Sequence, residues 1–165
     1  MSESNRRALR ACHSRSVLLA HVIWTTHDRQ PRLARSADTW LASWLSHKAT
    51  ELGCRLLACG NADDHVHLVL RYPVTLCVAD LVHGLKGACS HAWNLSLAAR
   101  LGRLAWQTGY WAESVSPTDL ARLMSYVLHQ REHHDGRSTS EIWEALLSRH
   151  PRQPSAAGLR DETVP

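Results

Sequence analysis

The chain has 165 residues, with 19 lysines and arginines against 15 aspartates and glutamates, and only Lys48 and Lys86 among these cations are lysines. This length suits one domain with its own core, and five cysteines without a CxxC pair argue against a disulfide framework. The longest apolar stretch, residues 17–24, is too short to cross a bilayer, which excludes a helical membrane protein and favours a soluble cytoplasmic one.

The arginine bias suggests a class of partner without deciding it. Seventeen of the 19 cations are arginines, and the planar guanidinium pairs well with phosphate. Nucleic acid would suit this bias, but the arginine-rich codon usage of a GC-rich genome explains it equally well. The charge alone therefore assigns no function.

The first half of the chain predicts a strand, a helix and a hairpin. Residues 16–26 are rich in β-branched and apolar side chains and lead into a polar loop, which is typical of a strand. Residues 36–53 repeat apolar side chains at helical spacing and stop at Gly53. Two apolar runs, Leu56–Cys59 and Val66–Leu70, flank the turn-forming segment GNADD and predict a β-hairpin.

A second helix and a fourth strand are expected next. Residues 75–97 repeat apolar side chains every three or four positions, with a break expected at Gly84 or Gly87. Residues 106–115 alternate enough to predict a strand.

The C-terminal part predicts helices and a tail. One helix should begin at Ser116–Pro117, a cap followed by proline at the first helical position, and a short final helix should cover residues 139–150. We expect an N-terminal extension over residues 1–15, one folded domain over residues 16–150 and a flexible tail over residues 151–165.

The predicted order is strand, helix, strand, strand, helix, strand, followed by helices. This order matches the split βαβ arrangement of a ferredoxin-like sandwich. We therefore expect an α+β fold in which one antiparallel sheet carries helices on one face, with extra helices at the C-terminus. Such a fold hosts many unrelated functions, so the function must come from particular residues.

His65 and His67 alternate around one valine at the start of the second hairpin strand. Residues two apart in a strand point to the same face, so the two imidazoles should lie a few ångströms apart. Two neutral imidazoles placed in this way form half of a metal site. On the triplet alone, the polar face of a half-buried strand is an equally good explanation.

Tyr126 and Gln130 stand four residues apart in a predicted helix, and therefore on one of its faces. A helix face with a phenol and an amide oxygen could complete a metal site with the two imidazoles. Tyr and Gln at this spacing also occur by chance on many helices, so the pair by itself indicates an ordinary surface more often than a site.

Five segments occur in the order, and at about the spacing, of single-tyrosine HUH transposases. They are DDHVHLVL (63–70), LVHGLKGACSHAWN (81–94), LAWQTGYWAESV (104–115), LMSYVLHQREHH (123–134) and SEIWEALL (140–147). The opening LLAHVIWTTHDRQPRL (18–33) is similar to that family's first strand and basic loop. Over roughly residues 16–149, the chain resembles the insertion sequence 200/605 family and its domesticated relatives, the REP-associated tyrosine transposases.

The resemblance implies an enzyme that cuts and rejoins single-stranded DNA at hairpin-flanked sites, with a divalent ion such as Mg²⁺ or Mn²⁺ and a 5′-phosphotyrosine intermediate. His65 and His67 match the family's two histidine ligands, Gln130 matches the third protein ligand and Tyr126 matches the nucleophile. It also implies a homodimer, in which such proteins typically combine the HxH of one subunit with the tyrosine helix of the other. The expected location is the bacterial cytosol, near the nucleoid and away from membranes.

Candidates for contact with the DNA backbone are Lys86, Arg29, Arg32 and Arg35, with solvated surface as the alternative for each arginine. The alternative function is a domesticated REP or hairpin DNA-binding protein that keeps the fold without transposition. The intact ligand and nucleophile set favours the enzyme.

Other residues compete for these roles. Tyr110 lies in an aromatic strand, where packing or base stacking suits it better than nucleophilic attack, and Tyr72 precedes a proline at a strand end that we expect at the surface. His129, His133 and His134 could form a zinc site, but no cysteine lies at ligand spacing from them.

Overall fold

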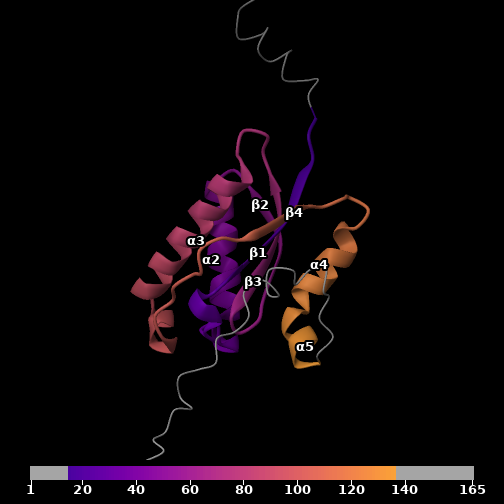
Figure 1. The fold of residues 1–165 in the computed structure, drawn as a ribbon. Helices are drawn as coiled ribbons and strands as arrows, with labels where there is room; N and C mark the ends of the chain where they lie inside the picture. The colour runs from indigo at the N-terminus through magenta and orange to yellow at the C-terminus, as the bar shows by residue number, and fades with distance from the viewer. Residues whose placement is uncertain (1–14, 137–165) are drawn as a thin grey trace, which may run out of the picture.

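The computed structural model describes residues 15–136, which form helices packed on a four-stranded sheet (Figure 1). The strands are β1 (Leu18–Thr25), β2 (Arg55–Asn61), β3 (His65–Tyr72) and β4 (Trp111–Ser114). The α-helices are α2 (Asp38–Glu51), α3 (Val78–Leu95), α4 (Leu120–Leu128) and α5 (Gln130–Asp135). Short 3-10 turns cover His27–Arg29, Arg35–Ala37 and Leu97–Leu101.

The sheet order is β2-β3-β1-β4, and all neighbouring strands are antiparallel. The two central strands pair over their full length, from Leu18 opposite Tyr72 to Thr25 opposite His65. Both are almost entirely buried because helices cover both faces of the sheet, so they read as nearly continuous apolar runs. This topology confirms the ferredoxin-like α+β prediction.

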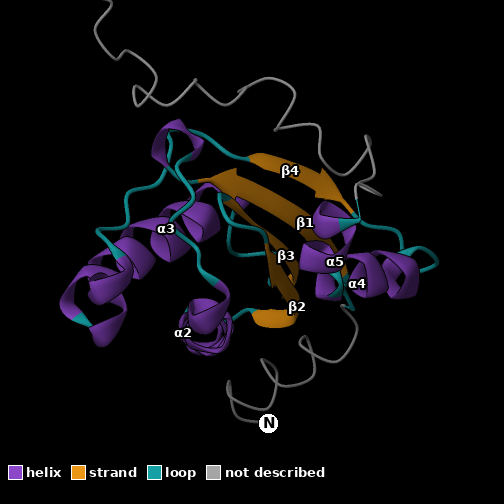
Figure 2. Ribbon diagram, turned by 90° about the horizontal axis from the view of Figure 1, so that it is seen from below, coloured by secondary structure: helices purple, strands orange, loops and turns teal. Residues whose placement is uncertain are grey.

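Helices α2 and α3 cover one face of the sheet and enclose the main core (Figure 2). Alternate residues of β1 and β3 point into this layer, where the apolar faces of both helices meet them. The fully buried members include Val22, Trp24, Leu41, Leu45, Leu68, Leu70, Leu81, Leu85 and Trp93.

Helices α4 and α5 lie on the opposite face (Figure 2). A smaller apolar cluster holds α4 there, with Leu123, Tyr126 and Val127 packed on Ala58 of β2 and Val69 of β3. The histidines of β1 and β3 point to this face because side chains alternate along a strand. The second layer therefore covers the residues that the sequence singles out.

Gly60 on β2 permits this second layer to approach closely. A Cβ atom at position 60 would lie 1.7 Å from the carbonyl oxygen of Val127 and 3.1 Å from Cβ of Gln130. Only glycine leaves room for the backbone at the end of α4.

The structure differs from the prediction in one helix break, one strand length and one helix start. The expected break in α3 is wrong: the helix is continuous, because Leu81, Leu85 and Cys89 hold successive turns against the core. Gly84 instead faces the side chain of Leu52, to which a Cβ atom would come within 3.2 Å.

The predicted 106–115 strand is shortened to Trp111–Ser114, because Gly109 adopts a positive φ of 88° between it and a single bridge from Trp106 to Thr26. The predicted helix start at Ser116–Pro117 is also too early. Ser116 caps a turn, accepting the N–H of Asp119 on its carbonyl at 3.0 Å, and α4 begins at Leu120.

The predicted final helix, residues 139–150, lies outside the described residues. Within residues 15–136, the four cysteines are free thiols. In the same range, the helices fall short of the length and apolarity that a membrane span requires.

Candidate active site

His65 and His67 lie side by side under α4 and α5. Their ring centroids are 5.1 Å apart and both side chains are 0% exposed. The prediction that they share one face is confirmed. The strand face is fully buried rather than half-buried, since the second helical layer excludes solvent from both rings.

A carboxylate orients His65. Its Nδ1 lies 2.7 Å from Oδ1 of the buried Asp64, whose Oδ2 accepts the Nε–H of Arg29 at 3.0 Å. A carboxylate only accepts hydrogen bonds, so the proton of His65 belongs on Nδ1 and the lone pair on Nε2. Metal-binding histidines are typically held in this way by an outer carboxylate.

Gln130 approaches this Nε2 from the opposite layer. Its amide Nε2 lies 3.2 Å from Nε2 of His65, and the residue is 1% exposed. A half-turn of the amide would place the Gln130 oxygen at the same point. The structure thus brings Gln130 of α5 to His65 and His67 of β3, although it lies 63 or more positions further along the sequence.

Tyr126 completes the cluster. Its ring lies 6.2 Å from that of His67, edge to face, and stacks on His133 with centroids 4.6 Å apart. The helix predicted to carry both Tyr126 and Gln130 is interrupted at His129, which ends α4 with φ −103° and ψ 22°. The side chains of Tyr126 and Gln130 nevertheless point to the imidazoles, because the interruption changes only the direction of the last helical turn.

Arg131 fixes α5 in place, a role that the sequence did not reveal. Its guanidinium donates to both carboxylate oxygens of Asp38, to Asp63 at 2.7 Å and to the carbonyl of Leu33. Burial lowers the pKa of Arg131, but the hydrogen bonds to Asp38 and Asp63 raise it by more than burial lowers it. The pKa of Arg131 therefore lies above its ordinary value. The preceding residue, Gln130, is thereby held over the sheet.

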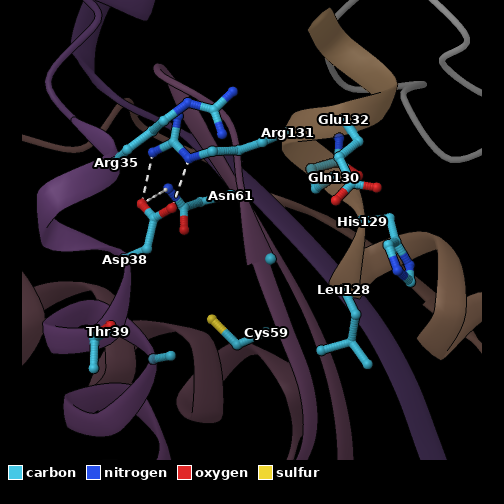
Figure 3. A pocket seen from close by; sticks show the side chains of 12 residues that line it. Arg35, Asp38, Thr39, Cys59, Asn61, Leu128, His129, Gln130, Arg131 and Glu132 are labelled. Carbon is cyan, nitrogen blue, oxygen red and sulfur yellow. Dashed lines mark hydrogen bonds and ion pairs between the residues drawn. The ribbon is translucent and has the colours of Figure 1, made fainter. Parts of the chain in front are cut away.

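A cavity of about 380 Å³ lies beside the hydrogen bonds of Arg131, between α2, β2 and α5 (Figure 3). Figure 3 shows both Arg131 and Asn61 reaching Asp38, and Cys59 also lines the cavity. Burial raises the pKa of the Cys59 thiol to about 12, so this sulfur is protonated and unreactive at neutral pH.

The predicted basic residues do not form one cluster. Arg29 contacts the site through Asp64, Arg32 bonds Gln30, and Arg35 pairs with Asp135. Lys86 belongs to α3, on the far layer, where it donates to the carbonyls of residues 107 and 109. Burial lowers the pKa of Lys86 to about 8.

The competing residues have other surroundings. Tyr110 is 37% exposed, whereas Tyr72 is half-buried against the main core, so its expected surface position is only partly right. His129 bonds the carbonyl of Ser125 at 2.7 Å, while His134 contacts His65. Within residues 15–136, no three His, Cys, Asp or Glu side chains are grouped to hold a metal, which contradicts the zinc alternative.

The donor chemistry fits a different ion. Two imidazole nitrogens and one amide oxygen suit Mn²⁺, and the oxygen donor also suits Mg²⁺. The carboxylate behind His65 supplies the outer support that such ligands require.

Residues 14–130 match the family described as "Transposase IS200 like". Among solved structures, the chain is similar to a candidate transposase from Deinococcus radiodurans R1, with 27% identity, a TM-score of 0.57 and coverage of 72% of this chain and 95% of that one. The fold also resembles a REP-associated tyrosine transposase bound to a REP hairpin, with 14% identity, a TM-score of 0.55 and coverage of 99% and 100%. Among curated proteins, none matches significantly. Because the family match spans most of the chain, and the sheet and its helices agree with it, this protein belongs to the IS200-like transposases.

Proposed function

We propose that this transposase cleaves and rejoins single-stranded DNA at hairpin-flanked sites through a 5′-phosphotyrosine intermediate on Tyr126. The observation that carries the proposal is the convergence of Tyr126 and Gln130 on the buried His65–His67 pair. Family membership supplies the transposase role, and this convergence supports the chemistry.

Two imidazoles and one amide would hold the divalent cation, Mg²⁺ or Mn²⁺. His65 and His67 would each use Nε2, and Gln130 would use its side-chain oxygen. The chemistry supplied by a bound ion is neutralisation of a non-bridging phosphate oxygen and alignment of the phosphorus for in-line attack.

Tyr126 would act as the nucleophile. Its hydroxyl oxygen bonds to phosphorus while the bond from phosphorus to the 3′ oxygen of the preceding nucleotide breaks. The phenol proton is lost to solvent, and the 3′ oxygen gains a proton and leaves as a hydroxyl. The phosphotyrosine retains the ester, so a 3′-hydroxyl can reverse the step without ATP, which suits strand transfer better than hydrolysis.

The stacking partner of Tyr126 supports this assignment. The His133 ring lies almost parallel to the phenol, with an angle of 19° between the two planes, and so restricts the ring's orientation. A nucleophile held in one orientation loses less entropy when the phosphate arrives.

The proposed substrate is single-stranded DNA that carries a hairpin. The structurally similar REP-associated transposase is bound to a REP hairpin, which supports the same class of ligand here. We propose that Arg29, Arg32, Arg35 and Lys86 contact backbone phosphates, and that the protein acts as a homodimer in the bacterial cytosol. Arg35 is exposed and Arg32 is half-buried, so Arg35 is the more accessible of the two for phosphate contact.

The proposed nucleophile is tested by covalent capture on a hairpin-bearing single-stranded oligonucleotide with Mn²⁺. Wild-type protein should form an adduct that survives denaturing electrophoresis, joined through a 5′-phosphate. Tyr126→Phe keeps the ring's packing but lacks the hydroxyl, so it should bind the hairpin normally and form no adduct. Tyr110→Phe is the matched control and should form the adduct as wild type does.

An adduct in Tyr126→Phe, or DNA mapped to Tyr110, would contradict the assignment. Wild-type protein that binds the hairpin tightly but forms no adduct with either Mg²⁺ or Mn²⁺ would instead favour the domesticated hairpin-binding protein.

A further inference from the structure

We propose that His21 and Glu113 form a hydrogen-bonded positioning pair that fixes the tautomer of His67, and so sets the metal affinity of the proposed active site. This inference rests on the proposed function, because it assigns an outer support to one of its ligands. Neither His21 nor Glu113 is among the residues that the sequence singled out for the site.

The pair follows from the strand register. His21 of β1 lies directly opposite Glu113 of β4, and diagonally from His67, whose own partner on β1 is Ile23. Diagonal neighbours on one face of an antiparallel sheet are within reach of long side chains. Three adjacent strands thereby contribute one residue each to a single row.

The row is hydrogen-bonded from end to end. Nδ1 of His67 lies 2.9 Å from Nε2 of His21, and Nδ1 of His21 lies 2.9 Å from a carboxylate oxygen of Glu113. The two rings are stacked, with centroids 5.1 Å apart and an angle of 25° between their planes. His21 is 0% exposed, while the Glu113 side chain reaches the sheet edge at 28%.

The order of protons follows from the carboxylate. Glu113 can only accept, so a neutral His21 donates from Nδ1 and keeps its lone pair on Nε2. That lone pair must accept the Nδ1–H of His67. The remaining lone pair of His67 then lies on Nε2, the atom that the proposed function assigns to the metal.

His65 is supported by an equivalent arrangement. Asp64 bonds Nδ1 of His65 directly, whereas Glu113 acts on His67 through one intervening imidazole. Each ligand thus has its proton directed to Nδ1 by a carboxylate. Burying a histidine costs free energy unless it is hydrogen-bonded. An apolar side chain, like those of Leu19 and Ile23 beside it on this face, would satisfy packing at position 21. Packing alone therefore does not explain the histidine there.

Glu113→Gln is the sharpest test. The amide has nearly the same shape as the carboxylate but can donate as well as accept, so it no longer imposes one order of protons on His21 and His67. If Glu113 only helped to hold the fold together, Glu113→Gln would change neither the histidine tautomers nor the Mn²⁺ affinity. Glu113 is also partly exposed, so the variant should fold.

The first measurement is the tautomer of each histidine by nitrogen-detected NMR, without added metal. Wild-type His67 should carry its proton on Nδ1, whereas Glu113→Gln should show a mixture of both tautomers. His65, supported separately by Asp64, should be unchanged and serves as the internal control.

The second measurement is calorimetric titration with Mn²⁺. Outer-support variants of metal-binding histidines typically lose about 10- to 100-fold in affinity, and we expect this loss for Glu113→Gln and for His21→Phe. Ser114→Ala, next to Glu113 on β4, is the matched control and should bind as wild type does.

Two failures are distinguishable. Mn²⁺ binding that Glu113→Gln leaves unchanged, or a wild-type His67 protonated on Nε2, would overturn the positioning role and leave the proposed function standing. Wild-type protein that does not bind Mn²⁺, or binds it equally after His65→Ala and His67→Ala together, would overturn the proposed function itself.

Discussion

At the scale of single residues, the imidazoles of the candidate site contribute to the fold in addition to their proposed role as metal ligands. A strand-surface ligand could be removed with little effect on folding, but His65 is fully enclosed and satisfies one oxygen of the buried Asp64. Leaving a buried acceptor without its donor costs about 1–3 kcal/mol. Loss of function and loss of stability must therefore be measured separately here.

We expect His65→Ala to lower the free energy of unfolding by about 1–3 kcal/mol, because it removes the partner of one Asp64 oxygen and empties a packed position. Urea denaturation followed by circular dichroism measures this change. The exposed His91 on α3 offers a control, since His91→Ala should alter stability by less than about 0.5 kcal/mol. Equal unfolding free energies for the two variants would show that His65 contributes nothing to the fold.

At the scale of elements, the docking of α4 and α5 on the sheet decides whether a site exists. The main core needs neither helix, because α2 and α3 already cover the other face. The second layer is held by a small apolar cluster and by Arg131. Disturbing this layer should affect chemistry more than folding.

Gly60→Ala is the direct test of this docking. The new methyl group would meet the Val127 carbonyl, a backbone atom that cannot move without shifting the end of α4. We expect a cost of about 1–3 kcal/mol in stability, as for overpacked sites, together with a severe loss of DNA adduct formation. Thermal unfolding and covalent capture measure the two effects.

Gly87→Ala is the matched control for that experiment. A Cβ atom there meets nothing within 4 Å, and position 87 lies inside α3, where alanine is the better helix former by roughly 0.5–1 kcal/mol. This variant should be slightly more stable and fully active. Normal adduct formation by Gly60→Ala would mean that the contact between α4 and β2 is not part of the active arrangement.

At the scale of the whole molecule, one chain supplies both halves of the candidate site. Tyr126 and Gln130 approach the histidines of their own sheet. The family resemblance led us to expect the tyrosine helix of one subunit to serve the other within a dimer. The contacts within this chain are those of a site completed in cis, and assembly in trans within a dimer stays a prediction.

Mixed subunits distinguish these arrangements. Inactive His65→Ala protein combined with inactive Tyr126→Phe protein should form no DNA adduct if each chain carries its own site. Covalent capture after co-expression, with each variant carrying a different affinity tag, measures this in proven mixed dimers. Restored adduct formation would demonstrate assembly in trans, and a monomer by light scattering would count against the proposed homodimer.

Much of the architecture was readable in local patterns. Alternation around Val66 placed two histidines on one face, and the order of apolar segments predicted the ferredoxin-like topology, because strand and helix periods depend on neighbouring residues alone. The motifs shared with HUH transposases predicted the family that residues 14–130 match. The predicted ends were less accurate. Gly109, whose carbonyl accepts from the distant Lys86, shortens the strand, and a local turn after Ser116 delays the start of α4.

The supports of the site could be found only in three dimensions. His21 meets His67 across 46 positions of sequence and Glu113 across 92, and Arg131 reaches Asp38 across 93. Such pairs have no period or spacing of their own, because strand register and helix docking bring them together after the chain has folded. The sequence singled out the residues proposed to ligate a metal or attack a phosphate, whereas the tertiary contacts decide how those residues are oriented and shielded from water.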